Sequence, residues 1–266
     1  MLRDYQIEMK TRLMEAWKAH RSVMVQMPTG TGKTHLLASV VSEFVSSAGS
    51  GVWLIAHRRE LVEQMEETLA KYGIRREDTP VRVMSVQWLS RHWNEAGDAP
   101  GLIVIDEAHH ALAASYTEMW KRYPAAKKLG VTATPCRLNR RGFTELFEVL
   151  VTSWSIAEFI EKGVLSVFDY VSIRPGSEEQ RLIDGLEKRG VDGDYQVKEM
   201  DAVLNRRPGI ERLYRSVRQF ASGKKGMVYA ISIEHARRIA EYYSRRGVNA
   251  VAVDSNCLLY TSDAAD

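Results

Sequence analysis

The hydrophobic positions divide the chain into a regular first half and a less regular second half. Between residues 23 and 134, short apolar runs alternate with longer amphipathic stretches. This alternation is typical of a parallel sheet whose strands are joined by crossover helices. The predicted strands are residues 23–27, 52–56, 81–85, 102–106 and 128–132, and the predicted helices include residues 33–47 and 58–71. The pattern therefore predicts an α/β fold.

The regular alternation ends near residue 143. A second strand–helix–strand pattern follows at residues 226–255, with predicted strands at 227–231 and 250–254. Between the two patterns lie amphipathic helical stretches and a Gly- and Asp-rich run at 184–195. These changes predict a first domain over residues 1–150, a connecting helical region over 151–205, part of a second domain over 206–255 and a separate tail over 256–266.

Composition excludes several classes of protein. The 266 residues are 45% hydrophobic and 27% charged, which is ordinary for a globular protein. Apolar runs such as residues 102–105 are far shorter than the roughly 20 residues that a membrane span needs. The N-terminus carries charges where a signal peptide is apolar, so we expect a cytoplasmic protein without a membrane partner. Cys136 and Cys257 lack metal-site spacing.

Positive charge is concentrated in one segment, although the formal net charge of the chain is only +3. Eleven Lys or Arg residues and three acidic residues lie between Arg206 and Arg246. Two interpretations remain open. The segment can form ordinary solvated helix faces, or it can form a surface that faces phosphate groups.

A phosphate-binding loop is indicated by "MPTGTGKT" at residues 27–34, between a predicted strand and a predicted helix. Glycines let backbone N–H groups turn toward phosphate oxygens, while Lys33 can contact the β- and γ-phosphates and Thr34 can bind Mg²⁺. The alternative is a glycine-rich turn with an accidental Lys-Thr pair. The predicted nucleotide contacts are Thr29, Gly30, Thr31, Gly32, Lys33 and Thr34.

An acidic pair follows the apolar strand in "LIVIDEAHH" at residues 102–110. Ligands of open α/β sheets bind at the carboxyl ends of the strands, where this pair is expected to lie. Asp106 is placed to hold Mg²⁺, and Glu107 can polarise the attacking water as a general base. The alternative is an acidic helix N-terminus that is favoured by the helix dipole.

Five motifs follow one another along the first half of the chain: "LRDYQ" (2–6), "PTGTGKT" (28–34), "AHRRELVEQ" (56–64), "DEAH" (106–109) and "TATP" (132–135). Their order resembles superfamily 2 DEAD/DEAH-box helicases, in the branch related to type I and type III restriction-enzyme helicase subunits and bacterial repair helicases. This resemblance extends over residues 2–140 and implies a RecA-like P-loop NTPase domain followed by an incomplete second RecA-like domain. The family's loop begins Pro-Thr-Gly, so Met27 is expected where other phosphate loops have glycine.

The resemblance assigns roles residue by residue and implies an ATP hydrolase with ATP and Mg²⁺ as cofactors. Gln6 would read the adenine edge, and His109 would link the nucleotide site to the second domain. Thr132 and Thr134 would couple hydrolysis to movement. The implied catalytic residues are Lys33, Asp106, Glu107 and His109, the metal ligands are Thr34 and Asp106, and the nucleic-acid backbone contacts are His57, Arg58, Ser85 and Gln87.

The motifs favour DNA over RNA as the partner, because Pro-Thr-Gly together with "TATP" resembles the DNA-translocating branch. Restriction, repair and phage replication all use such motors. Two alternatives remain: an RNA helicase, and an ATP-gated nucleic-acid binding module without turnover. An unrelated phosphate-loop enzyme, such as a small-molecule kinase, leaves "TATP" and "AHRRELVEQ" unexplained.

The family's late Gln-x-x-Gly-Arg-x-x-Arg motif, whose arginines stabilise the transferring phosphoryl group, has no counterpart after Asp254. The last residues, "LLYTSDAAD" (258–266), resemble a translated sequencing adapter. We therefore expect a C-terminally truncated helicase that binds ATP, hydrolyses it poorly and aggregates readily.

Overall fold

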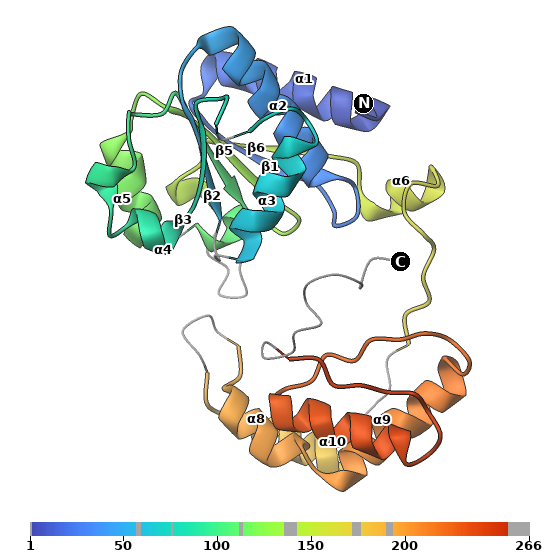
Figure 1. The fold of residues 1–266 in the computed structure, drawn as a ribbon. Helices are drawn as coiled ribbons and strands as arrows, with labels where there is room; N and C mark the ends of the chain where they lie inside the picture. Colours follow the sequence, from blue (N-terminus) through green and yellow to red (C-terminus); the bar gives the residue numbers. More distant parts are fainter. Residues whose placement is uncertain are drawn as a thin grey trace. The chain divides into compact units, whose positions relative to one another are not determined.

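The chain forms two compact units, Met1–Val167 and Phe168–Asp266 (Figure 1). The structure is a computed structural model, and it describes residues 2–56, 60–75, 77–111, 114–135, 143–171, 177–189 and 194–254. None of the helices in these ranges is both long and apolar enough to cross a membrane.

The first unit is built on a six-stranded parallel sheet with the order β3-β2-β4-β5-β1-β6. The five predicted strands are confirmed to within one residue, and β6 was not predicted. Because β6 pairs with β1 through Val23 and Val149, the sheet continues past residue 150. The strands are β1 (Ser22–Gln26), β2 (Val52–Ala56), β3 (Val81–Ser85), β4 (Leu102–Asp106), β5 (Lys127–Thr132) and β6 (Val149–Thr152).

Helices cover both faces of the sheet (Figure 1). One face packs against α1 (Asp4–Ala19), α2 (Lys33–Ala48), α3 (Glu60–Ala70) and α6 (Ile156–Glu161). The other packs against α4 (Val86–Leu89), α5 (Ala114–Arg122) and the 3₁₀ turns η1 (Trp93–Glu95) and η2 (Ala108–His110), and a third turn, η3 (Phe143–Glu145), precedes β6. Successive strand residues alternate between the faces, so Val23 and Val25 enter one core and Met24 the other. The result is a three-layer α/β unit.

Gly130, in the middle of β5, allows the η2 turn to approach the sheet closely. It pairs with Met24 on one side and Ile105 on the other. A Cβ atom at this position would lie 2.5 Å from Phe147 Cζ and 2.8 Å from Ala108 Cβ. Phe147 and Ala108 therefore pack directly on the strand backbone, and Ala108 belongs to the turn that follows the acidic pair.

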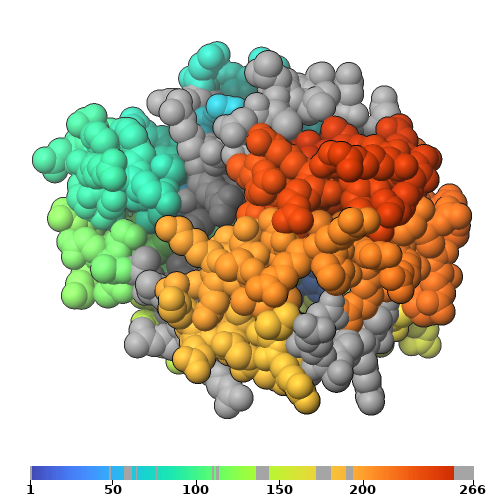
Figure 2. Space-filling view, turned by 90° about the horizontal axis from the view of Figure 1, so that it is seen from below, coloured from blue at the N-terminus to red at the C-terminus, as the bar shows by residue number. Residues whose placement is uncertain are grey.

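Helices are the main regular elements among the described residues of the second unit. Its helices are α7 (Ser177–Asp184), α8 (Val197–Leu204), α9 (Arg207–Phe220) and α10 (Ile233–Ser244). A small core of Ile210, Ile239 and Tyr243 joins α9 to α10, and Figure 2 shows the orange and red segments that contain these helices in contact. Tyr214 packs edge-on against Tyr243, with ring centroids 5.1 Å apart.

The strands predicted at 227–231 and 250–254 are not strands in the structure. The alternation is nevertheless visible in the burial of residues 250–254, whereas residues 227–229 are all exposed. Ala230 and Ala250 pack against the α9–α10 core, whereas Tyr229 is 91% exposed and Val251 is 73% exposed. An apolar alternation specifies which side chains face the core, but a strand also needs a hydrogen-bonded neighbour. Among the described residues of this unit, no such ladder forms.

Gly130→Ala is expected to destabilise the first unit by roughly 1–3 kcal/mol, because the added methyl group overpacks a site bounded by the Phe147 ring and Ala108 Cβ. Thermal unfolding followed by circular dichroism measures the effect. Gly51→Ala is the matched control, since a Cβ there would meet its nearest neighbour, Pro80 O, at an ordinary 3.5 Å. Equal melting temperatures for the two variants would contradict the packing role of Gly130.

Candidate nucleotide-binding site

Three neighbouring strands bring the predicted nucleotide residues to one edge of the sheet. The order β4-β5-β1 places these strands side by side. Gln26 of β1 is level with Thr132 of β5, and Asp106 of β4 is level with Val131. Because the strands are parallel, the segments after all three begin at the same edge. The phosphate loop, the acidic turn and the "TATP" segment therefore meet there.

The phosphate loop joins β1 to α2, and its glycines adopt the backbone conformation that the sequence requires. Gly30 and Gly32 have φ values of 83° and 78°, in the left-handed region that favours glycine. Thr31 is 1% exposed, and its hydroxyl donates to Pro28 O at 2.7 Å. The N–H of Met27 donates to Thr132 O at 3.0 Å. One hydrogen bond within the loop and one to β5 thus hold the loop in place.

The phosphate loop leads directly into the N-terminus of α2. Gly32 is the N-cap, and Lys33 and Thr34 are the first two helical residues. The unpaired N–H groups and the helix dipole at such a terminus favour a phosphate group. Lys33 is half-buried, whereas Thr29, Gly30 and Thr34 are exposed and can contact a nucleotide.

Two adjacent side chains of helix α1 donate hydrogen bonds to the phosphate loop. The Tyr5 hydroxyl donates to Thr31 O at 2.9 Å. Gln6 Nε2 donates to Thr31 O at 3.1 Å and to Gly32 O at 3.2 Å, while Gln6 Oε1 accepts from the N–H of Arg3 at 2.9 Å. In this structure the amide of Gln6 therefore contacts the phosphate loop, and reading adenine would require it to exchange these bonds.

Tyr5 was not predicted as a site residue. Its partner lies 26 residues away in the sequence, and no spacing rule connects a tyrosine on an amphipathic helix to a loop after the next strand. The available signal was its position directly before Gln6. A side chain at Gly32 would also collide with Gln6 Nε2, so helix and loop fit each other closely.

The acidic turn begins at Asp106, the last residue of β4. Burial raises the pKa of Asp106 above its ordinary value, and the negative charge of Glu107 raises it further. The Glu107 N–H, which donates to Asp106 Oδ1 at 3.0 Å, lowers that pKa, as do the positive charges of Lys33 and His109. The positive charge of Lys33 therefore acts on the Asp106 carboxylate, although the two residues belong to segments that begin at different strands.

Glu107 has a backbone conformation that side chains rarely adopt. Its φ is 49°, and among the residues that the structure describes it is the one residue other than glycine with a positive φ. Such conformations cost of order 1–3 kcal/mol and concentrate at functional sites. The turn places a 38%-exposed carboxylate next to the phosphate-binding edge.

A chain of polar contacts connects this turn to the segment after β5. His109 Nδ1 lies 3.3 Å from Glu107 Oε2 and 2.9 Å from Thr132 Oγ1. The Thr132 hydroxyl donates to Thr134 O and accepts from Thr134 N–H, both at 3.1 Å. If the Thr132 hydroxyl donates to Thr134 O, the His109 tautomer that completes the contact with Thr132 carries its hydrogen on Nδ1. Glu107, His109, Thr132 and Thr134 thus form one network.

The predicted magnesium ligands suit an ion that arrives with a nucleotide. Mg²⁺ usually takes one or two protein ligands and completes its shell with phosphate and water. Thr34 offers an exposed hydroxyl, and Asp106 offers a carboxylate whose charge is disfavoured by burial and would be offset by a cation. Within the described residues, no group of three or more His, Cys, Asp or Glu could hold a metal. The residues fit Mg²⁺.

The predicted nucleic-acid contacts lie partly within the described residues. Ser85 ends β3 and caps α4, where its hydroxyl accepts from Trp88 N–H at 3.2 Å. Gln87 is exposed on α4. The Trp88 ring, at 39% exposure, stacks on His92 with ring centroids 4.8 Å apart. His57 and Arg58 lie outside the described residues.

Known proteins with similar sequences or folds include restriction enzymes and a DNA translocase. A 51.5 kDa protein of a Lactococcus phage (isolate 7-9) is 27% identical over 234 residues, covering 87% of this chain and 49% of that protein. The DNA 3'-5' translocase XPB2 of Sulfurisphaera tokodaii is 28% identical over 205 residues, covering 71% of this chain and 44% of that protein. The chain thus spans about half the length of these relatives.

A solved structure supports the fold. The type ISP restriction-modification enzyme LlaGI, solved in complex with a DNA substrate mimic, has a TM-score of 0.51 and 12% identity, covering 82% of this chain and 24% of that one. The family model "Type III restriction enzyme, res subunit" matches residues 1–137, just over half of the chain. The chain therefore belongs to that family, and the superfamily 2 resemblance of its motifs is confirmed.

Proposed function

We propose that this chain carries the ATP-hydrolysing part of a DNA helicase or translocase. The observation that supports this most directly is the network from Glu107 through His109 and Thr132 to Thr134. A phosphate loop alone serves many reactions. Here the proposed general base, Glu107, is connected through the side chains of His109 and Thr132 to the segment after β5. Hydrolysis at Glu107 could therefore change the position of residues in that segment.

Hydrolysis would use groups that the sheet edge brings together. ATP would place its β- and γ-phosphates at the N-terminus of α2, with the Lys33 ammonium beside them. Mg²⁺, held by Thr34 and Asp106, would neutralise part of the phosphate charge. Glu107 would accept a proton from the attacking water, and its exposed carboxylate is accessible for this step.

The same proton transfer would start the coupling. A protonated Glu107 is neutral and attracts His109 less strongly, so the hydrogen on Nδ1 is shared more fully with Thr132 Oγ1. Thr132 is completely buried and bonds twice to Thr134, so a shift in His109 is passed to the exposed end of the segment. This series of shifts would connect the chemical step to a change in the backbone after β5.

DNA is the proposed track for this motor. The Sulfurisphaera tokodaii relative is named as a DNA translocase. Ser85 and Gln87, together with His57 and Arg58, would contact the sugar–phosphate backbone, a kind of contact that carries no sequence information. Adenine selection would be the task of Gln6. An RNA track, or an ATP-dependent clamp without turnover, are the alternatives that the experiments below separate.

ATP hydrolysis by the purified chain should increase when single- or double-stranded DNA is added, and Lys33→Ala should abolish the increase.

Glu107→Gln should lower the rate by roughly 10²- to 10⁴-fold while ATP still binds, because only the proton acceptor is lost. Glu118→Gln, an exposed glutamate that pairs with Arg122 on α5, is the control of equal charge change. ATP binding without turnover on any DNA would favour the clamp, and stimulation by RNA alone would reject the DNA track.

The role of Gln6 can be separated from that of Tyr5 by comparing nucleotides. Tyr5→Phe removes one hydrogen bond to the loop and should weaken ATP and GTP binding alike, by roughly 2- to 10-fold. Gln6→Ala should weaken ATP binding more and reduce the preference for ATP over GTP. Isothermal titration of both variants measures this. An equal loss for the two nucleotides in Gln6→Ala would restrict Gln6 to positioning the loop.

A further inference from the structure

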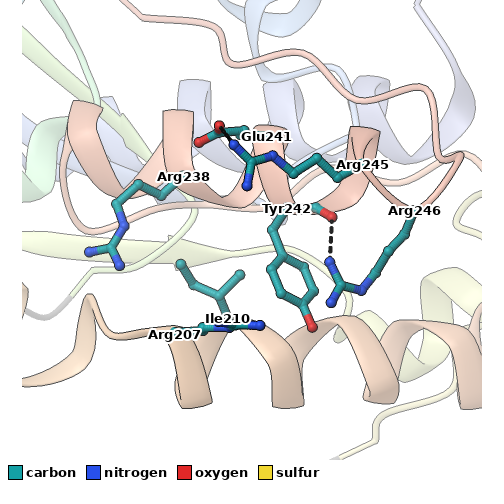
Figure 3. Close-up of a pocket in the computed structure, with 7 residues that line it drawn as sticks. All are labelled: Arg207, Ile210, Arg238, Glu241, Tyr242, Arg245 and Arg246. Atoms are coloured by element: carbon teal, nitrogen blue, oxygen red, sulfur yellow. Dashed lines mark hydrogen bonds and ion pairs between the residues drawn. The ribbon is translucent and has the colours of Figure 1, made fainter.

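A hollow of about 220 Å³ lies between α9 and α10 in the second unit, and arginine side chains surround it (Figure 3). It belongs to the basic segment for which two interpretations were open. Four arginines and one acid contribute to it. The lining residues are Arg207, Ile210, Arg238, Glu241, Tyr242, Arg245 and Arg246.

Helical spacing directs these residues to one place. Arg238 and Tyr242 of α10 and Arg245, the C-cap residue that follows it, are separated by four and three residues, so they share one face of the helix. Arg207 is the first residue of α9. In Figure 3, Tyr242 and Arg246 extend from α10 toward α9, where Arg207 and Ile210 lie. Positively charged side chains from both segments therefore border the hollow.

The contacts that orient two of the arginines leave their charge available. Arg238 donates to Asn205 O at 2.6 Å and to Asn205 Oδ1 at 3.0 Å, and both acceptors are neutral. The Arg246 guanidinium lies 3.5 Å from the centroid of the Tyr242 ring and donates to Tyr242 O at 3.2 Å. Arg245 pairs with Glu241. Fixed guanidinium groups with uncancelled charge are suited to binding a phosphate.

The size of the hollow matches a phosphate group better than a whole nucleotide. Pockets for drug-sized ligands have volumes of roughly 300–1,000 Å³, so about 220 Å³ is small. The row of charge continues outside it. Arg207, Arg215 and Arg218 recur on one side of α9, although Glu211 pairs with Arg215 at 3.0 Å. A charged row that extends past the hollow suits a polyanion more than a single small phosphate.

We propose that the hollow between α9 and α10 binds a backbone phosphate of nucleic acid, so that the second unit has its own contact with the strand. This inference rests on the proposed function, because it assumes that the chain binds DNA. Arg207 and Arg245, both exposed, contact the phosphate oxygens, and Arg245 exchanges its ion pair with Glu241 for this contact. Arg238 and Arg246 supply charge from fixed positions.

The test is the salt dependence of DNA binding by the full chain. Fluorescence anisotropy with a single-stranded oligonucleotide gives the binding constant over a series of salt concentrations. The double variant Arg207→Gln/Arg245→Gln should make the slope of log K against log salt less negative by about 1.4, since each single-strand phosphate contact contributes about 0.7. The variant Arg207→Lys/Arg245→Lys keeps both charges and should retain most of the slope.

Two further variants separate this effect from folding and from total charge. Lys224→Gln/Lys225→Gln removes the same charge from an exposed turn after α9 that does not line the hollow, and it should leave the slope unchanged. Glu241→Gln removes the acid from the hollow and releases Arg245, so it should tighten binding by roughly 2- to 5-fold. Tighter binding cannot result from misfolding.

The outcomes distinguish the two proposals. If the unmodified chain binds no DNA at any salt concentration, the proposed function fails and this inference fails with it. A second outcome is that the chain binds DNA, but Arg207→Gln/Arg245→Gln and the control Lys224→Gln/Lys225→Gln give the same slope of log K against log salt. That result would overturn the inference while the proposed function remains. Unchanged or weaker binding by Glu241→Gln would also count against it.

Discussion

The parallel register of β4, β5 and β1 is the constraint on which the candidate nucleotide site depends. Gln26 is level with Thr132, and Asp106 is level with Val131, so the three strands end together. Parallel strands must all send their following segments to the same edge, and helices must then carry the chain back. A slip in this register would separate Lys33 from Asp106 without altering either residue.

Packing under the acidic turn preserves this alignment. Ala108 lies on the backbone of β5 because Gly130 has no side chain. From the same strand, Thr132 Oγ1 lies 2.9 Å from His109 Nδ1. The turn is thus held at two points of β5, one apolar and one polar. The phosphate loop has two supports as well, since Met27 bonds to Thr132 while Tyr5 and Gln6 bond to the carbonyl groups of Thr31 and Gly32.

Much of the first unit could be predicted from the sequence because its strands are buried on both faces and appear as continuous apolar runs. The four-residue strand β6 was missed because so short a run, in a segment without regular alternation, carries little signal. In residues 250–254 of the second unit, alternation identified which side chains face inward, but strand formation depends on partners that a local pattern cannot specify. Among site residues, the loop glycines have the predicted conformation, whereas Tyr5 was missed because its contact is long-range.

The backbone of Glu107 has a consequence for the protein's evolution. At φ 49° the position would suit glycine or asparagine better than glutamate. A mutation to either residue would relieve strain and remove the proposed general base at the same time. Here stability and activity select for different residues, so a library screened for thermal stability alone should enrich inactive variants at this position.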